Sequence, residues 1–206
     1  MKWQLILGIF AGVVQIIATV PYLFSIIRGS TRPNLISWIL WAVTVSITLI
    51  AQISAGASWS IFLLIGATIC NLAVVFLCIK GYGYKKFGKI DIVTLILAAV
   101  AIIGWLISSN PLIAMIFAVA ADCIAYAPTI AKMYRYPATE QAIYWGLLVV
   151  ADIFALISVT AITLPNVIFP IAYGIMNGLG FFILFLSFFK LHEKRHFDKL
   201  KGSQRN

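Results

Sequence analysis

PYLFSIIRGSTRPNLISW, residues 21–38, has a counterpart 107 positions later in PTIAKMYRYPATEQAIYW, residues 128–145. Scarce residue types coincide at this shift, or at one residue less after a deletion further along: Pro21 with Pro128, Arg28 with Arg135, Trp38 with Trp145, and Asn71 with Asn177. Aliphatic matches carry little weight in a chain that is 63% hydrophobic, so these scarce types are the informative ones. They predict two copies of one unit, over about residues 15–77 and 122–183.

The composition indicates which solvent surrounds this chain. Its mean hydropathy is +1.05 and only 10% of its 206 residues are charged, which leaves too much apolar surface for a water-soluble core. Uninterrupted apolar runs of about 20 residues match the length of a helix that spans the hydrocarbon layer. Because lipid offers no hydrogen-bond partner to free backbone groups, these runs are expected to be helices. The sequence therefore predicts an all-α integral membrane protein.

Seven such runs predict two bundles of three spans with a single span between them. We expect the spans over residues 3–27, 35–55, 58–80, 90–108, 110–133, 140–161 and 166–190. The corresponding regions are a first bundle (1–80), a loop and linker helix (81–108), a second bundle (109–190) and a basic tail (191–206). The linker crossing lets both copies start on the same side, which predicts a 3+1+3 parallel repeat. We expect the first run to stay in the mature chain, because no A-x-A-like cleavage site precedes Pro21.

The distribution of basic residues predicts the orientation of the chain. Every Lys and Arg except Lys2 falls in the loops after the first, third and fifth spans or in the tail. The intervening loops, near residues 55–58, 108–110 and 163–166, carry none. Positively charged loops stay on the cytoplasmic side, so we expect an external N-terminus and a cytoplasmic C-terminus. The net charge of +9 is thus a topology signal that does not indicate nucleic acid, and membrane lipids are the expected partners.

Two acidic residues lie in the middle of predicted spans, Asp122 in the fifth and Asp152 in the sixth. A carboxylate at the bilayer centre costs about 2.5–3.5 kcal/mol on insertion scales, so neither is expected to face lipid. The repeat pairs Asp122 with Gln15 and gives Asp152 no acidic counterpart, so the two halves differ chemically. Two interpretations are open: these residues bind a solute or carry a proton, or they are hydrogen-bonded acids that join helices.

Asn71 and Asn177 occupy the middle of the third span of each bundle, where a two-fold axis would place them opposite each other. Carboxamides offer donors and an acceptor to a neutral polar ligand, although Asn also joins helices in membranes. On the second span, polar and aromatic residues three or four apart share one helix face, including Thr44. The expected substrate contacts from these patterns are Asn71, Asn177, Gln52, Trp41 and Thr48.

Prolines and tryptophans mark the basic ends of the spans. Pro21 and Pro128 lie shortly before the ends of the first and fifth spans, where each removes a helix hydrogen bond. They act either as hinges of an inner gate or as static bends. Trp38 and Trp145 lie one turn inside the same boundary. Tryptophan is common there as an interfacial belt residue, and a gate or stacking surface is the other interpretation.

These residues resemble the SWEET and PQ-loop transporter superfamily over nearly the whole chain. The shared features are the 3+1+3 layout, the external N-terminus, a proline near the end of the first helix of each bundle, and Asn71 and Asn177, which match the family's central Asn pair at the substrate site. The segment from Pro21 to Thr31 resembles a PQ-loop segment, although Tyr22 and Thr129 replace the Gln of each Pro-Gln pair. Counting back from Asn177 to the family's aromatic platform reaches Ser158–Ala161, which contains no Trp, and Ser158 joins the expected substrate contacts.

The resemblance implies a transporter that moves a small polar solute, sugar-like or amino-acid-like, by alternating access between two three-helix bundles. Asp122 and Asp152 make a proton-coupled carrier the rival of a simple facilitator. A non-transporting receptor or adaptor on the same fold is the alternative. We expect the protein in the inner, or plasma, membrane of a bacterium. A homo-oligomer stays open, but both bundles lie in one chain and need no partner to form a path.

This sequence lacks the key residues of other classes of membrane protein. A retinal protein needs a Lys in the middle of the seventh span, and Lys190 lies at its end. Both histidines, His192 and His196, lie in the tail, so no cluster at depth predicts an enzyme. The three cysteines fall inside predicted spans and indicate neither a disulfide nor a metal site. We expect no catalytic residue, cofactor or metal.

Overall fold

The chain forms seven α-helices in the computed structural model, which describes residues 2–54, 56, 58–84, 86–107 and 110–203 and omits the side chains of 101, 105, 111, 114 and 190–203. The helices are α1 (Lys2–Ile27), α2 (Leu35–Ser54), α3 (Ile61–Leu77), α4 (Lys89–Ile107), α5 (Pro111–Arg135), α6 (Ala142–Ile157) and α7 (Leu164–Ser203). A π-helical turn (Cys78–Tyr82) follows α3, and a 3-10 turn (Pro137–Thr139) separates α5 from α6. No β-strand occurs within these described ranges, which confirms the predicted all-helical class for them.

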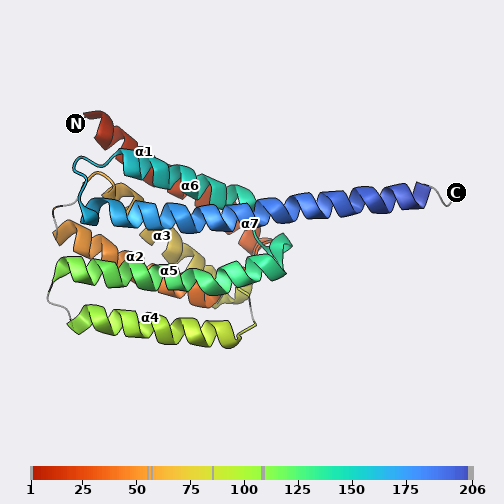
Figure 1. The fold of residues 1–206 in the computed structure, drawn as a ribbon, viewed down its shortest axis with the longest axis horizontal. Coiled ribbons are helices and arrows are strands. Elements are labelled where there is room, and N and C mark those ends of the chain that lie inside the picture. Colours follow the sequence, from red (N-terminus) through yellow and green to blue (C-terminus); the bar gives the residue numbers. More distant parts are fainter. Residues whose placement is uncertain (1, 55, 57, 85, 108–109, 204–206) are drawn as a thin grey trace.

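Two groups of three helices lie side by side with the same internal packing (Figure 1). In the first half α3 packs against both α1 and α2, and in the second half α7 packs against both α5 and α6. The halves meet along two seams, where α1 contacts α6 and α2 contacts α5. Helix α4 lies outside both groups, against α5. Residues on these two seams are therefore the ones that can join or separate the halves.

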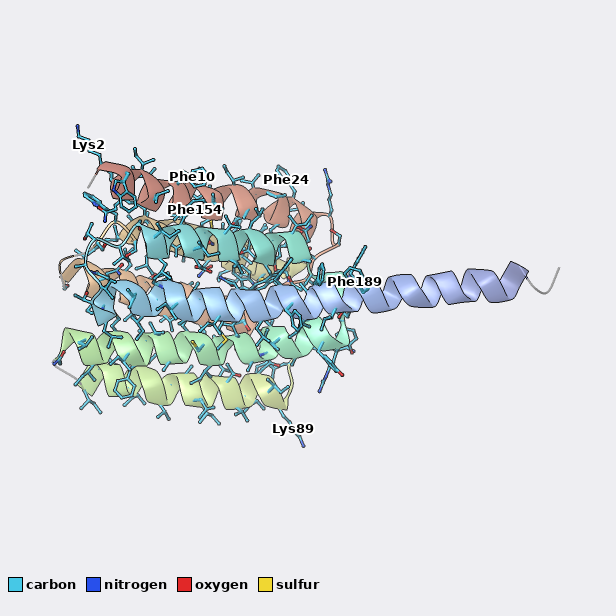
Figure 2. The ribbon with its side chains drawn as sticks, turned by 45° about the horizontal axis from the view of Figure 1, so that its top comes forward. Lys2, Phe10, Phe24, Lys89, Phe154 and Phe189 are labelled. Carbon is cyan, nitrogen blue, oxygen red and sulfur yellow. The ribbon has the colours of Figure 1, made fainter. Side chains whose placement is uncertain are left out.

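Large apolar side chains cover the outside of the helices. Phe10, Phe24 and Phe189, labelled in Figure 2, are 46%, 57% and 54% exposed. Soluble monomers rarely expose a contiguous apolar patch larger than a few hundred Å². Five helical stretches are long and apolar enough to cross a membrane, namely Lys2–Ile27, Leu35–Ser54, Ile61–Tyr82, Met115–Arg135 and Leu164–Phe189, and Ala142–Ile157 is a shorter apolar helix. These observations indicate an integral membrane protein.

The basic loops gather at one end of the helices, which we call the basic end. The backbone amide of Arg32 donates to the carbonyl of Thr139 (3.1 Å), which joins the α1–α2 loop to the α5–α6 loop. The amide of Tyr84 donates to the carbonyl of Pro33 (2.7 Å), which brings in the segment after α3. The other end, which we call the opposite end, contains the α2–α3 and α6–α7 loops. There the amide of Thr160 donates to Ser58 Oγ (3.2 Å).

Helices α1 and α3 approach each other closely because two glycines of α1 face backbone atoms around the start of α3. A Cβ atom added at Gly8 would lie 2.3 Å from the carbonyl oxygen of Trp59, and one at Gly12 would lie 2.5 Å from that of Phe62. Real Cβ atoms do not come this close to another heavy atom. In lipid, no hydrophobic force drives helices together. Small residues spaced four apart are a common way to bring membrane helices close enough to pack.

Replacing Gly12 by Ala is expected to destabilise the fold by about 1–3 kcal/mol, because the added methyl forces α1 away from α3. Titration with a denaturing detergent, followed by circular dichroism, measures this change. Gly178→Ala on α7 is the matched control, because its nearest neighbour would be Val149 Cγ2 at 4.0 Å. Equal stability of the two variants would contradict the close α1–α3 contact.

Helix α7 differs from the prediction at its end. The expected seventh span stops at residue 190, whereas α7 continues as one helix to Ser203, projecting beyond the other helices (Figure 1). The segment after Phe189 is rich in Lys, Glu, Leu and Arg, which favour helix even where no packing supports it. The basic tail is therefore an extension of the helix as far as Ser203.

Candidate functional site

The carboxyl group of Asp122 lies on the seam between the halves. Its Oδ1 accepts hydrogen bonds from the hydroxyl of Thr44 on α2 (2.5 Å) and from that of Tyr173 on α7 (2.9 Å). The indole nitrogen of Trp41 donates to the backbone carbonyl of Asp122 (3.2 Å), so α2 contacts this residue twice. Asp122 is 1% exposed, and its Oδ2 is buried without a hydrogen-bond partner among the described residues. One oxygen of this carboxyl group is thus free for a proton or a ligand.

Asp152 is held entirely within the second half. Its Oδ2 accepts from Asn177 Nδ2 on α7 (2.8 Å), and Asn177 Oδ1 accepts from the hydroxyl of Tyr126 on α5 (2.8 Å). This chain of bonds connects one residue from each of α5, α6 and α7. All three side chains are buried. Buried polar networks of this kind fix the relative positions of the helices that they join.

Aromatic rings from both halves surround these carboxyl groups. The rings of Trp41 and Tyr126 are 4.5 Å apart between centroids, and Tyr126 also contacts Tyr173 and Trp145, each at 6.1 Å. Trp41 belongs to the first half and the other three rings to the second. Aromatic residues with polar tips suit a site that contacts both apolar and polar parts of a solute. The site therefore combines two acids, one carboxamide and four rings, with no basic side chain among the hydrogen-bond partners found for the two acids within the described residues.

A buried ion pair closes the basic end. Lys132 on α5 and Glu140 after the 3-10 turn form a salt bridge, with side chains only 2% and 0% exposed. Glu140 Oε2 also accepts from the hydroxyl of Tyr22 on α1 (2.9 Å) and from the indole nitrogen of Trp145 (3.3 Å). Lys132 Nζ donates in addition to the carbonyl of Arg32. The pair thus contacts the first half at two points, Tyr22 and Arg32, and forms a latch between the halves.

Stacked rings lie directly beside this latch. Tyr22 of α1 stacks on Tyr144 of α6, with centroids 4.0 Å apart and planes 19° apart. Trp38 of α2 lies 5.7 Å from Tyr22 and 6.3 Å from Tyr144. The α1–α6 seam at the basic end is therefore filled by aromatic side chains from both halves.

The opposite end is joined by polar contacts of a different kind. Gln52 on α2 donates to the backbone carbonyl of Pro165 at the start of α7 (3.0 Å) and to Ser60 Oγ (3.4 Å). The side chain of Gln4 on α1 donates to the carbonyl of Val159 after α6 (3.4 Å). The bonds to Pro165 and Val159 run between the halves, whereas the bond to Ser60 lies within the first half. The observed conformation is therefore bridged at both ends, with the carboxyl groups between them.

The structure distributes the expected substrate contacts along the helices. Trp41 and Asn177 belong to the central site, whereas Gln52 lies at the opposite end. The hydroxyls of Thr48 and Ser158 donate to backbone carbonyls of their own helices, those of Thr44 and Ala155.

Asn71 and Gln15 of the first half do not mirror their counterparts in the second. Both are buried, at 5% and 6% exposure, but within the described residues neither side chain makes a hydrogen bond. Asn177 by contrast is fully engaged by Tyr126 and Asp152. The two halves therefore use the matched positions differently.

The gate residues of the prediction lie at the basic end. Trp38 and Trp145 are each 1% exposed and pack inside the protein, so the interpretation as lipid-facing belt residues is wrong. Pro21 is exposed and Pro128 is buried, and both α1 and α5 continue as helices past them. Whether either proline acts as a hinge stays a prediction. A third helix-interior proline, Pro170 of α7, was not considered from the sequence.

Sequence reasoning missed the latch and two of the central tyrosines. From the sequence, no role in the site was assigned to Glu140, and Lys132 was placed among the loop charges. One signal was present: a lone acid in a basic loop eight residues after a lysine is a candidate ion pair. No group of three or more His, Cys, Asp or Glu suited to a metal ion occurs in the part of the chain that the structure describes.

No protein-family model matches this sequence, and no curated protein matches it significantly.

Proposed function

We propose that this protein is a transporter that moves a small polar solute across the membrane by alternating access between its two halves. The observation that carries the proposal is the position of Asp122. It is a buried carboxyl group with one free oxygen, hydrogen-bonded to both halves on the seam between them. Ionisable residues in the membrane interior commonly mark a substrate or proton path.

Seven membrane crossings, arranged as a parallel 3+1+3 repeat, form the framework of the proposal. The matching contacts within the halves and along the two seams support it. In this arrangement the basic end is cytoplasmic, as the positive-inside rule requires. We further propose membership of the SWEET and PQ-loop superfamily and a location in a bacterial inner membrane, on the sequence features alone.

Transport in this scheme alternates between two sets of contacts. Opening toward the cytoplasm breaks the latch, where Tyr22 meets Glu140 and Arg32 meets Lys132. Opening toward the outside breaks the bonds of Gln52 and Gln4 to the second half. If only one set opens at a time, the central site faces one side of the membrane at a time. The substrate class remains as proposed from the sequence, sugar-like or amino-acid-like, with or without proton coupling.

A ligand screen followed by a flux assay tests this function. Purified protein is heated with sugars, amino acids and vitamins, since a ligand that binds the folded state raises the melting temperature. The ligands that stabilise the protein are then tested for uptake into proteoliposomes. Saturable binding without flux would overturn the transporter and favour the alternative, a receptor or adaptor on the same fold.

The two asparagines are expected to respond differently to replacement by alanine. Asn177→Ala leaves Asp152 Oδ2 and the Tyr126 hydroxyl without partners, so it should cost about 1–3 kcal/mol of stability and also abolish uptake. Asn71→Ala removes no protein hydrogen bond, so it should lower uptake about tenfold with the melting temperature unchanged. Uptake in proteoliposomes and thermal unfolding measure the two effects. Unchanged uptake by Asn71→Ala would remove that residue from the site.

A further inference from the structure

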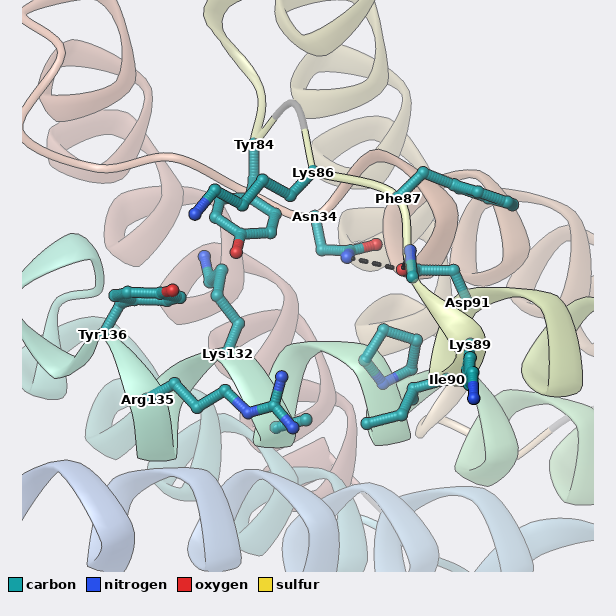
Figure 3. Close-up of a pocket in the computed structure, with 13 residues that line it drawn as sticks. Asn34, Tyr84, Lys86, Phe87, Lys89, Ile90, Asp91, Lys132, Arg135 and Tyr136 are labelled. Atoms are coloured by element: carbon teal, nitrogen blue, oxygen red, sulfur yellow. Dashed lines mark hydrogen bonds between the residues drawn. The ribbon is translucent and has the colours of Figure 1, made fainter.

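A pocket of about 490 Å³ opens at the basic end between the start of α4 and the end of α5 (Figure 3). Four basic side chains line it, and they come from both sides: Lys86 and Lys89 from the segment that leads into α4, and Lys132 and Arg135 from α5. We call this the basic pocket. Its size falls within the range of small-molecule sites. It is separate from the central site, whose residues do not line it.

Three of the four charges in the basic pocket have no acidic partner. Lys132 is neutralised by Glu140 in the latch. Lys86, Lys89 and Arg135 are exposed and form no salt bridge with any residue that the structure describes. Like charges collected in a concave site repel one another and attract an anion from solution.

One acid, Asp91, also lines the basic pocket, and within the described residues it forms no salt bridge with the three exposed basic side chains. Asp91 is 6% exposed, and its two oxygens accept from Asn34 Nδ2 (3.0 Å) and from the backbone amide of Gly88 (2.7 Å). Figure 3 shows the Asn34–Asp91 bond at the edge of the pocket. This acid therefore holds the start of α4 against the α1–α2 loop and leaves the three exposed cations free for a ligand.

Aromatic side chains form one wall of the basic pocket. Tyr84 and Tyr136 lie 6.0 Å apart between ring centroids, and the ammonium group of Lys86 lies 5.6 Å from the centre of the Tyr136 ring. This contact restrains the Lys86 side chain at the rim. A guanidinium group and two ammonium groups around one cavity match the oxygens of a phosphate group, which Arg binds in a bidentate manner and Lys as a point charge.

We propose that the basic pocket binds a phosphate-bearing anion. Two sources share this chemistry: the headgroup of an anionic lipid, and a soluble phosphorylated compound on the same side of the membrane. Both would reach the basic end, which in the proposed topology faces the cytoplasm and the lipid headgroups of that side. The inference concerns binding alone, so it stands or falls independently of transport.

The test uses the full chain in phosphatidylcholine nanodiscs, with pyrophosphate as the soluble probe. Pyrophosphate raises the melting temperature, and the triple variant Lys86→Gln, Lys89→Gln, Arg135→Gln raises the half-saturating concentration about tenfold, as loss of three exposed charge contacts predicts. The matched control removes three exposed basic side chains outside the pocket: Lys2→Gln, Arg28→Gln and Lys80→Gln. Added sodium chloride weakens the effect in the wild type.

A second arm distinguishes the two sources. Nanodiscs with equal parts phosphatidylcholine and phosphatidylglycerol are compared with pure phosphatidylcholine in the absence of pyrophosphate. If phosphatidylglycerol raises the melting temperature of the wild type and of the control variant but not of the pocket triple variant, the site is assigned to a lipid headgroup. This holds even if pyrophosphate has no effect. Lack of response to both probes, or equal loss in both triples, overturns the proposal. If the pocket triple does not fold, Arg135→Gln alone serves in the same comparison.

Discussion

Replacing Glu140 by Gln is expected to destabilise the protein by about 3–5 kcal/mol. The reason is that Lys132 then keeps its charge in a place where its side chain is only 2% exposed. Gln retains an oxygen that can accept from Tyr22 and Trp145, so the variant isolates the loss of the negative charge. Thermal unfolding in detergent and titration with a denaturing detergent measure the change.

The double variant Lys132→Met, Glu140→Gln is the control for this prediction. Removing both members of a buried pair is often neutral, because no charge remains unpaired. We expect it to recover most of the lost stability, less the bond from Lys132 to the carbonyl of Arg32. A double variant as unstable as the single one would mean that Glu140 acts through its hydrogen bonds rather than its charge.

The same two variants test whether the latch acts as a gate. If the latch closes the cytoplasmic side, the double variant should favour the conformation open to that side. A cysteine placed at Thr44, on the central seam, should then react faster with a soluble thiol reagent added from the basic side. An unchanged rate would mean that the latch is structural only.

Much of the fold could be predicted because it depends on composition and on the length of apolar runs. The expected spans over residues 3–27 and 35–55 lie within one residue of α1 and α2 at each end, since the polar loop at 28–34 separates two unbroken apolar segments. The end of α7 was missed for the opposite reason. Its continuation to Ser203 is polar, and hydropathy cannot distinguish a polar helix from a loop.

The partners within the site could not be predicted, because they depend on which helices meet. Asp122 was expected to avoid lipid, but its bond to Thr44 follows from the α2–α5 seam, which no sequence pattern gives. The tryptophans show the same limit. A tryptophan one turn inside the membrane boundary can contact lipid or lie in the protein interior. The packing of Trp38 against Tyr22 shows that it lies in the interior.

The two central acids have different surroundings, and this separates their expected roles. Among the described residues, the side chain of Asp152 accepts its one hydrogen bond from Asn177, within the second half. Asp122 is bonded to α2 and to α7, so its contacts change whenever the halves move apart. An ionised carboxylate at this depth needs a cation nearby, and no basic side chain is among its described partners. A proton on the free oxygen meets that need, and in a proton-coupled carrier the proton occupancy of Asp122 would respond to the opening of the seam.

Asp122→Asn is therefore expected to abolish accumulation driven by a pH gradient while leaving exchange of the solute across the membrane. A gradient of one pH unit is worth about 1.4 kcal/mol per proton, so a carrier coupled to one proton accumulates its solute about tenfold. The Asn variant, which cannot titrate but keeps an acceptor for Thr44 and Tyr173, should equilibrate at a ratio of about one. Proteoliposomes with an imposed gradient give the accumulation ratio, and counterflow at equal pH gives the exchange rate.

Asp122→Glu should restore part of the accumulation, and Thr44→Val should slow it without uncoupling it. Tenfold accumulation by Asp122→Asn would show that this carboxyl group only joins the halves, and that any coupling to protons lies elsewhere.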